Sequence, residues 1–157
     1  MKQISHSYLL AFLGIGFVTG ISSSQLVTGV GQSFPLSPLS LLISLPVIAI
    51  IMVLATLPIY RYRKKSEKYQ SGPRPTRPNP FFAYRALVFS RAVALTGALF
   101  AGWHLGQLIW LLTFSVAPSQ LVVPTLFGLI GGLTMLGGGL IGENNCRAPR
   151  DPGEGTE

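Results

Sequence analysis

The chain consists of two long apolar stretches separated by polar segments. No charged residue occurs between positions 3 and 60 or between positions 92 and 142. Roughly 20 helical residues cross a bilayer core about 30 Å thick. Each stretch is therefore long enough for two membrane spans and a turn, and the pattern predicts an all-α integral membrane protein.

Proline and glycine divide each apolar stretch in two. The first is interrupted at residues 31–38 and the second at residues 117–120, where helices are expected to end. Asn79 and Pro80 are a typical N-cap and first helical residue for the third span. We therefore predict four transmembrane helices in two hairpins, residues 1–60 and 81–142, with spans at 8–29, 39–60, 82–114 and 121–142.

The composition excludes several classes of protein. Hydrophobic residues make up 48% of the chain and charged residues 11%, against roughly 25% charged residues in soluble domains. An ordinary soluble enzyme and most nucleic-acid-binding domains do not fit, and we expect no nucleic-acid partner. Cys146 is the only cysteine, which excludes a disulfide scaffold.

The positions of the basic residues predict the orientation. All twelve Lys and Arg lie outside the two short hairpin turns. By the positive-inside rule, both termini and the central segment are cytoplasmic in a multi-pass plasma-membrane protein. Residues 61–80 are expected to form a basic, proline-rich extended loop, and residues 143–157 a disordered polar tail.

The loop carries seven basic residues and one acidic residue. Basic residues next to a span contribute about 1 kcal/mol each at an anionic surface. One hypothesis is that the loop binds anionic lipid at the cytoplasmic face, and the other is that its charges only set the orientation. The lipid hypothesis rests on Arg61, Arg63, Lys64, Lys65 and Lys68.

Glycines recur four residues apart in three of the four spans. Such pairs let helix backbones approach closely. They either pack the four helices together or leave a glycine face for a second protein. The second span has no glycine, so we expect it to face lipid most. The pairs are Gly16 and Gly20, Gly102 and Gly106, Gly128 and Gly132, and Gly138 and Gly142.

Arg91 and Glu143 occur at the cytoplasmic ends of the third and fourth spans. The two residues are expected at similar depth, because each follows or precedes an uncharged span of similar length. If these antiparallel helices touch, an ion pair is geometrically reasonable. The alternative is that Arg91 extends to the lipid headgroups.

His104 is the one histidine expected near mid-membrane. We expect it to form a hydrogen bond with a neighbouring helix. A polar stretch at residues 22–25 is placed to meet Gln107 and Trp110 in a small outward-facing pocket. No catalytic constellation, cofactor site or metal cluster is expected.

Two stretches resemble a known family. They are residues 91–106, RAVALTGALFAGWHLG, and the end of the fourth span, where Gly142 and Glu143 precede Cys146, Arg147 and Pro149. The chain resembles a family of small uncharacterised four-span membrane proteins of actinobacteria, often encoded near folate-biosynthesis genes. The resemblance implies a fold and a cell envelope, not an activity, and matches the family's basic residue to Arg91.

These observations favour a non-enzymatic accessory or scaffold subunit that binds another integral membrane protein. The alternative is a small transporter or a lipid-handling membrane protein.

Overall fold

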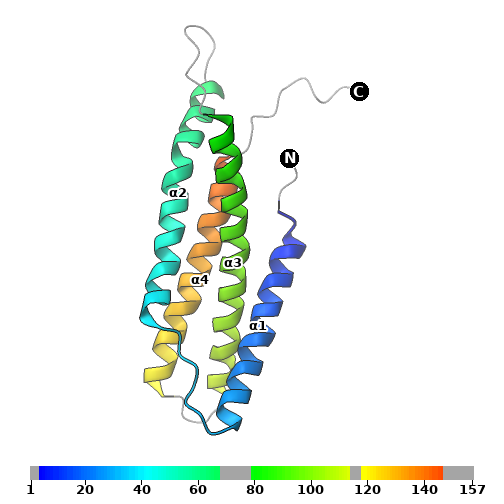
Figure 1. Ribbon diagram of the computed structural model, residues 1–157, viewed down its shortest axis with the longest axis vertical. Helices are drawn as coiled ribbons and strands as arrows, with labels where there is room; N and C mark the ends of the chain where they lie inside the picture. Colours follow the sequence, from blue (N-terminus) through cyan, green and yellow to red (C-terminus); the bar gives the residue numbers. More distant parts are fainter. Residues whose placement is uncertain (1–3, 68–78, 114–117, 147–157) are drawn as a thin grey trace.

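The computed structural model of the chain describes residues 4–67, 79–113 and 118–146. Each helix is long and apolar enough to cross a membrane, so the predicted all-α fold of a multi-pass membrane protein is confirmed. The helices are α1 (His6–Gly29), α2 (Leu39–Glu67), α3 (Pro80–Leu112) and α4 (Ser119–Asn145), as Figure 1 shows.

Local signals in the sequence account for the helix starts. The side chain of Asn79 accepts a hydrogen bond from the Phe81 backbone N–H at 3.0 Å, and Pro80 occupies the first turn of α3. The predicted start of this helix is therefore confirmed. At α1, the hydroxyl oxygen of Ser5 accepts from the Ser7 N–H at 3.3 Å.

α2 extends beyond its predicted end. The helix runs to Glu67, so residues 61–67 are helical rather than part of an extended loop, and that prediction is wrong for them. Arg and Lys are good helix formers, and the first proline after this segment is Pro73. The predicted tail is likewise wrong for residues 143–145, which form the last turn of α4. The rest of the predicted loop, residues 68–78, and the rest of the tail, residues 147–157, lie outside the described residues.

The helices are arranged around a central pair. α3 packs most extensively against α4, α1 packs against α3, and α2 packs against α4 and less against α3. Figure 1 shows α1 and α2 on opposite sides of this pair. α1 begins, α2 ends, α3 begins and α4 ends at one end of the molecule, which we call the charged end. We call the opposite end the turn end.

α1 and α2 are separated by the central pair of helices. Within the described residues these helices make no direct packing contact with each other. The two helices of the first hairpin follow each other in the sequence but do not lie side by side. Buried residues make up 17% of the most apolar stretch of α1 and 22% of that of α2, so most residues of both helices lie at the surface of the bundle. α2 packs closely because α4 supplies glycines: Gly131 faces Leu45, and Gly138 faces Ala49.

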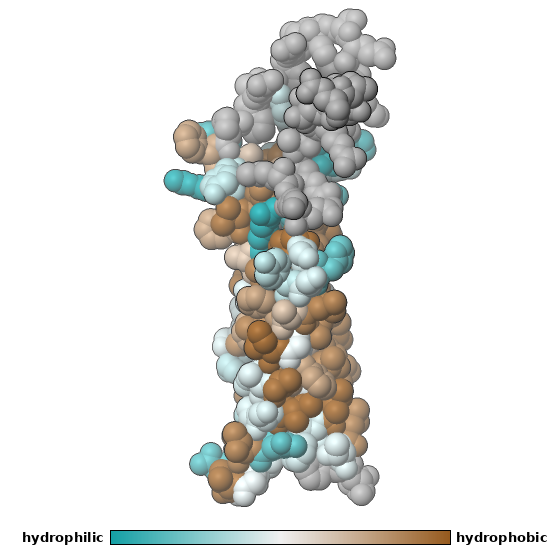
Figure 2. All heavy atoms as spheres, turned by 90° about the vertical axis from the view of Figure 1, so that its right-hand side faces the viewer, coloured by the Kyte–Doolittle hydropathy of each residue, from teal (hydrophilic) through white to brown (hydrophobic). Residues whose placement is uncertain are grey.

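The interior of the bundle is built from small side chains. Ala94, Ala98 and Ala101 of α3 are almost fully buried, while large apolar side chains lie on the outside. Figure 2, seen from the side of α1, shows apolar surface along the middle of the molecule and polar residues toward its ends. Small side chains inside and large apolar side chains outside are the reverse of the distribution in soluble proteins, and they suit a helix bundle surrounded by lipid.

Candidate functional site

The last turn of α4 is the most connected polar region at the charged end. Glu143 bonds to α3 and to the segment before α1, while Asn144 and Asn145 bond to α2. We call these three residues, together with their partners, the charged-end cluster. Its partners come from the start of the chain, α2 and α3, so the cluster joins all the helices at this end.

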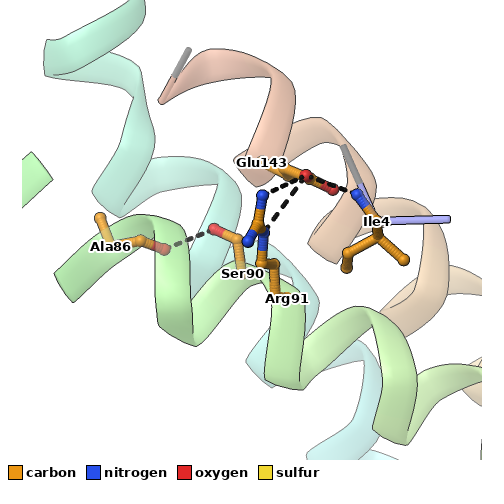
Figure 3. A network of polar contacts seen from close by, with 5 residues as sticks. All are labelled: Ile4, Ala86, Ser90, Arg91 and Glu143. Atoms are coloured by element: carbon orange, nitrogen blue, oxygen red, sulfur yellow. Dashed lines mark hydrogen bonds and ion pairs between the residues drawn. The ribbon is translucent and has the colours of Figure 1, made fainter. Parts of the chain in front are cut away.

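Glu143 lies at the centre of this cluster, as Figure 3 shows. One carboxylate oxygen, Oε1, accepts hydrogen bonds from Nε and Nη2 of Arg91 at 3.3 Å and from the Ile4 backbone N–H at 3.0 Å. The side chain of Glu143 is 6% exposed and that of Arg91 is 35% exposed. The structure therefore brings together the two residues of the predicted ion pair, and adds the segment before α1.

α2 contributes two further contacts to the cluster. The buried Asn145 side chain donates to the Thr56 hydroxyl at 3.1 Å. Arg63 donates from Nη1 to the Asn144 carbonyl oxygen at 2.8 Å, which satisfies one of the free carbonyls at the C-terminus of α4. Sequence reasoning missed Ile4, Thr56 and Asn145. A lone threonine in an otherwise apolar part of α2 was the available signal.

The residues of the lipid hypothesis divide into two groups. Arg63 bonds to α4, whereas Arg61, Lys64 and Lys65 are exposed on α2. Lys68 lies outside the described residues. The guanidinium of Arg63 and the ammonium of Lys64 lie 5.6 and 6.0 Å from the centre of the Tyr60 ring.

All eight glycines of the predicted pairs contact other helices of this chain. The pairs of α1 and α3 face each other, because a side chain at any of these four positions would overlap backbone atoms of the opposite helix. The glycines of α4 face α2 or α3. None is left for a partner protein, so the interpretation as a partner interface is wrong for these residues: Gly16, Gly20, Gly102, Gly106, Gly128, Gly132, Gly138 and Gly142.

His104 is fully buried in the half of the bundle nearer the turn end. Its Nδ1 lies 2.8 Å from the Phe100 carbonyl oxygen, so Nδ1 carries the proton. Nε2 then accepts from the Ser37 hydroxyl at 3.0 Å. Gly128 makes room for the ring, because a side chain there would overlap it. The partner of His104 is therefore the connection between α1 and α2, not a neighbouring helix.

Gln107 also binds this connection, because its amide nitrogen donates to the Pro35 carbonyl oxygen at 3.0 Å. The predicted pocket joining residues 22–25 to Gln107 does not form in this way. Ser24 instead donates to the Gly20 carbonyl oxygen at 2.8 Å within α1. Buried polar groups at this end therefore fix the path of residues 30–38.

An apolar groove of about 380 Å³ lies between α2 and α4. Pro46 contributes to it from α2 and Pro124 from α4. The hydroxyl of Thr134, also in its lining, donates to the Gly131 carbonyl oxygen. The almost entirely apolar lining of the groove is suited to a hydrocarbon chain. The other lining residues are Leu39, Leu42, Ile43, Val123, Phe127, Ile130 and Gly131.

Cys146 is the C-cap residue of α4 and is half-buried. Burial raises the pKa of its thiol, which makes it a poor nucleophile near neutral pH. Within residues 4–67, 79–113 and 118–146, no group of three His, Cys, Asp or Glu side chains is placed to hold a metal ion.

Comparison with known proteins identifies a family without a known activity. No curated protein and no solved structure matches the chain. A family model described as "Protein of unknown function (DUF3180)" matches residues 9–150, which include all four helices except the first residues of α1. The chain therefore belongs to the DUF3180 family.

Proposed function

We propose that the protein is a non-enzymatic accessory or scaffold subunit of a membrane protein complex in the plasma membrane. The observation that carries this proposal is the outer stripe of α1, made of Ile15, Val18, Ser22 and Gln25. These residues recur at helical spacing and are all exposed, because α1 packs against α3 alone. The stripe is a continuous surface available to another helix.

The polar residues of the stripe favour a protein partner over lipid alone. Ser22 and Gln25 have no side-chain hydrogen bond to any described residue. Ser22 lies seven residues before the end of α1 at Gly29, about 10 Å along the helix. It is therefore well inside the apolar span and not at the end of the helix. Polar side chains contribute roughly 0.6–2 kcal/mol when they bond across membrane helices, so a partner helix with complementary groups would stabilise this surface.

The proposed orientation places the charged end in the cytoplasm. This follows from the basic residues, which all lie outside the hairpin turns. Both termini are then cytoplasmic. The actinobacterial origin and the neighbouring folate genes, implied by the resemblance, stay predictions.

Site-specific photocrosslinking in cells that express the native complex tests the proposal. A crosslinker at Ser22 or Gln25 should give one discrete product with a second membrane protein. The same group at Ile50, exposed on α2, is the matched control and should give none. Ser22→Leu with Gln25→Leu should then release the partner without unfolding the chain.

Two results would contradict the accessory role. Equal crosslinking at Ile50 would mean that the stripe is not selective, and a product of two copies of this chain would mean self-association instead. The alternative function is lipid handling, which the apolar groove between α2 and α4 favours. Lipid handling would be indicated by a lipid that stays bound to the purified protein and is lost when Phe127→Trp fills the groove.

A further inference from the structure

α2 continues past its apolar part into a short basic segment. Residues 39–59 are uncharged and give a helical length of about 32 Å, which matches a bilayer core of about 30 Å. Tyr60 then lies at the membrane interface, where tyrosine is enriched. The residues that follow enter the headgroup layer as a helix rather than as a loop.

The basic side chains of this segment are not equivalent. Arg63 is held by the Asn144 carbonyl oxygen at 2.8 Å, so it fixes the rotation of α2 against α4. Arg61, Lys64 and Lys65 are exposed. At about 100° per residue they fall within roughly 100° of one another around the helix, on one face.

This face carries three positive charges, and none of them forms an ion pair with a side chain that the structure describes, which on α2 means the side chains up to Lys65. Glu143, an acidic side chain at the charged end, is buried and pairs with Arg91. Tyr60 limits the motion of Lys64, whose ammonium lies 6.0 Å from the ring centre. Ammonium and guanidinium groups on one helical turn suit a phosphate group.

We propose that Arg61, Lys64 and Lys65 form a binding site for the phosphate headgroup of an anionic phospholipid. The site excludes Arg63, whose role is to hold α2 to α4. It is independent of the accessory role, because it lies on α2 and needs no protein partner. It also differs from a general attraction of basic residues to membranes, since it depends on three positions of one helix.

Native mass spectrometry of the full chain in mild detergent tests the site. The protein should retain phosphatidylglycerol in preference to phosphatidylcholine. Each charge removed should weaken retention about fivefold, so Arg61→Gln, Lys64→Gln and Lys65→Gln together should lower phosphatidylglycerol affinity about a hundredfold. Phosphatidylcholine retention should not change.

A matched control removes the same number of charges from the following segment, by Lys68→Gln, Arg74→Gln and Arg77→Gln. This variant should keep the phosphatidylglycerol preference. An equal loss in both triple variants would show that net charge alone attracts the lipid, and would overturn the site. No preference in the unchanged protein would also overturn it. Arg63→Gln should lower thermal stability while the folded fraction keeps its lipid.

Discussion

Arg91 and Glu143 lie 52 positions apart in the sequence and meet at 3.3 Å across the contact between α3 and α4. A carboxylate near the C-terminus of a helix is disfavoured by the helix dipole. Arg91 and the Ile4 N–H offset this cost, because both present positive charge or partial charge to the same oxygen. The pair therefore fixes α3, α4 and the segment before α1 relative to one another.

Arg91→Ala should destabilise the protein by about 2 kcal/mol, between the values for exposed and buried pairs, because it leaves Glu143 buried without its cation. Combining Arg91→Glu with Glu143→Arg should recover part of the loss. Recovery stays partial because an arginine cannot accept the Ile4 N–H. Unfolding in detergent measures these effects. Arg85→Ala, at an exposed position on α3, should cost under about 0.5 kcal/mol, and strictly additive single effects would rule out the coupling.

Glycine substitutions should separate contact positions from open ones on the same helices. Gly16→Ala and Gly132→Ala should cost about 1–3 kcal/mol or more, because the added methyl overlaps backbone of α3. Gly14→Ala and Gly137→Ala meet no atom within 4 Å and should be neutral or stabilising by up to about 1 kcal/mol. Thermal unfolding of the four variants compares them, and similar losses in all four would contradict the helix contacts described.

Two serines of the connection between α1 and α2 should behave differently. Ser37→Ala leaves the buried Nε2 of His104 without its donor, which should cost about 1–3 kcal/mol. Ser33 is exposed and has no hydrogen bond within the described residues, so Ser33→Ala should have little effect. Proteolysis at residues 30–38 should accelerate in the first variant only. Equal rates would mean that His104 does not hold this segment.

Cysteine labelling should reveal which end faces the cytoplasm. In a Cys146→Ser background, Ser33→Cys and Ser119→Cys should react with an impermeant maleimide added to intact cells, because the turn end is predicted to face out. Ser71→Cys should react only after the cells are opened. Labelling of residue 71 in intact cells would reverse the orientation.

The number, type and approximate bounds of the helices follow from the sequence, because uncharged length and proline positions are local properties. The similar depth of Arg91 and Glu143 also follows, because the two uncharged spans are of nearly equal length. Their contact depends in addition on α3 and α4 being neighbours. The neighbours of each helix do not follow. Whether α4 packs its glycines against α2 or α3 depends on the rotation of the helix. The sequence does not determine this rotation, because glycines occur on more than one face of α4.

The role of His104 could not be predicted either. Its partner, Ser37, is 67 positions away in a connection whose path is set by tertiary contacts. The helical extension of α2 was missed for a different reason. Lys and Arg signalled the end of the apolar span but not the end of the helix, because they favour helices.

The isolation of α1 from α2 has a consequence for biogenesis. During synthesis α1 and α2 reach the bilayer first, yet neither provides a packing surface for the other. The glycines of α1 remain without a counterpart until α3 has emerged, and α2 gains its main packing partner only with α4. The nascent protein thus holds two unpaired helices near the insertion machinery until α3 emerges, so truncation after residue 67 should leave a product open to quality-control proteases.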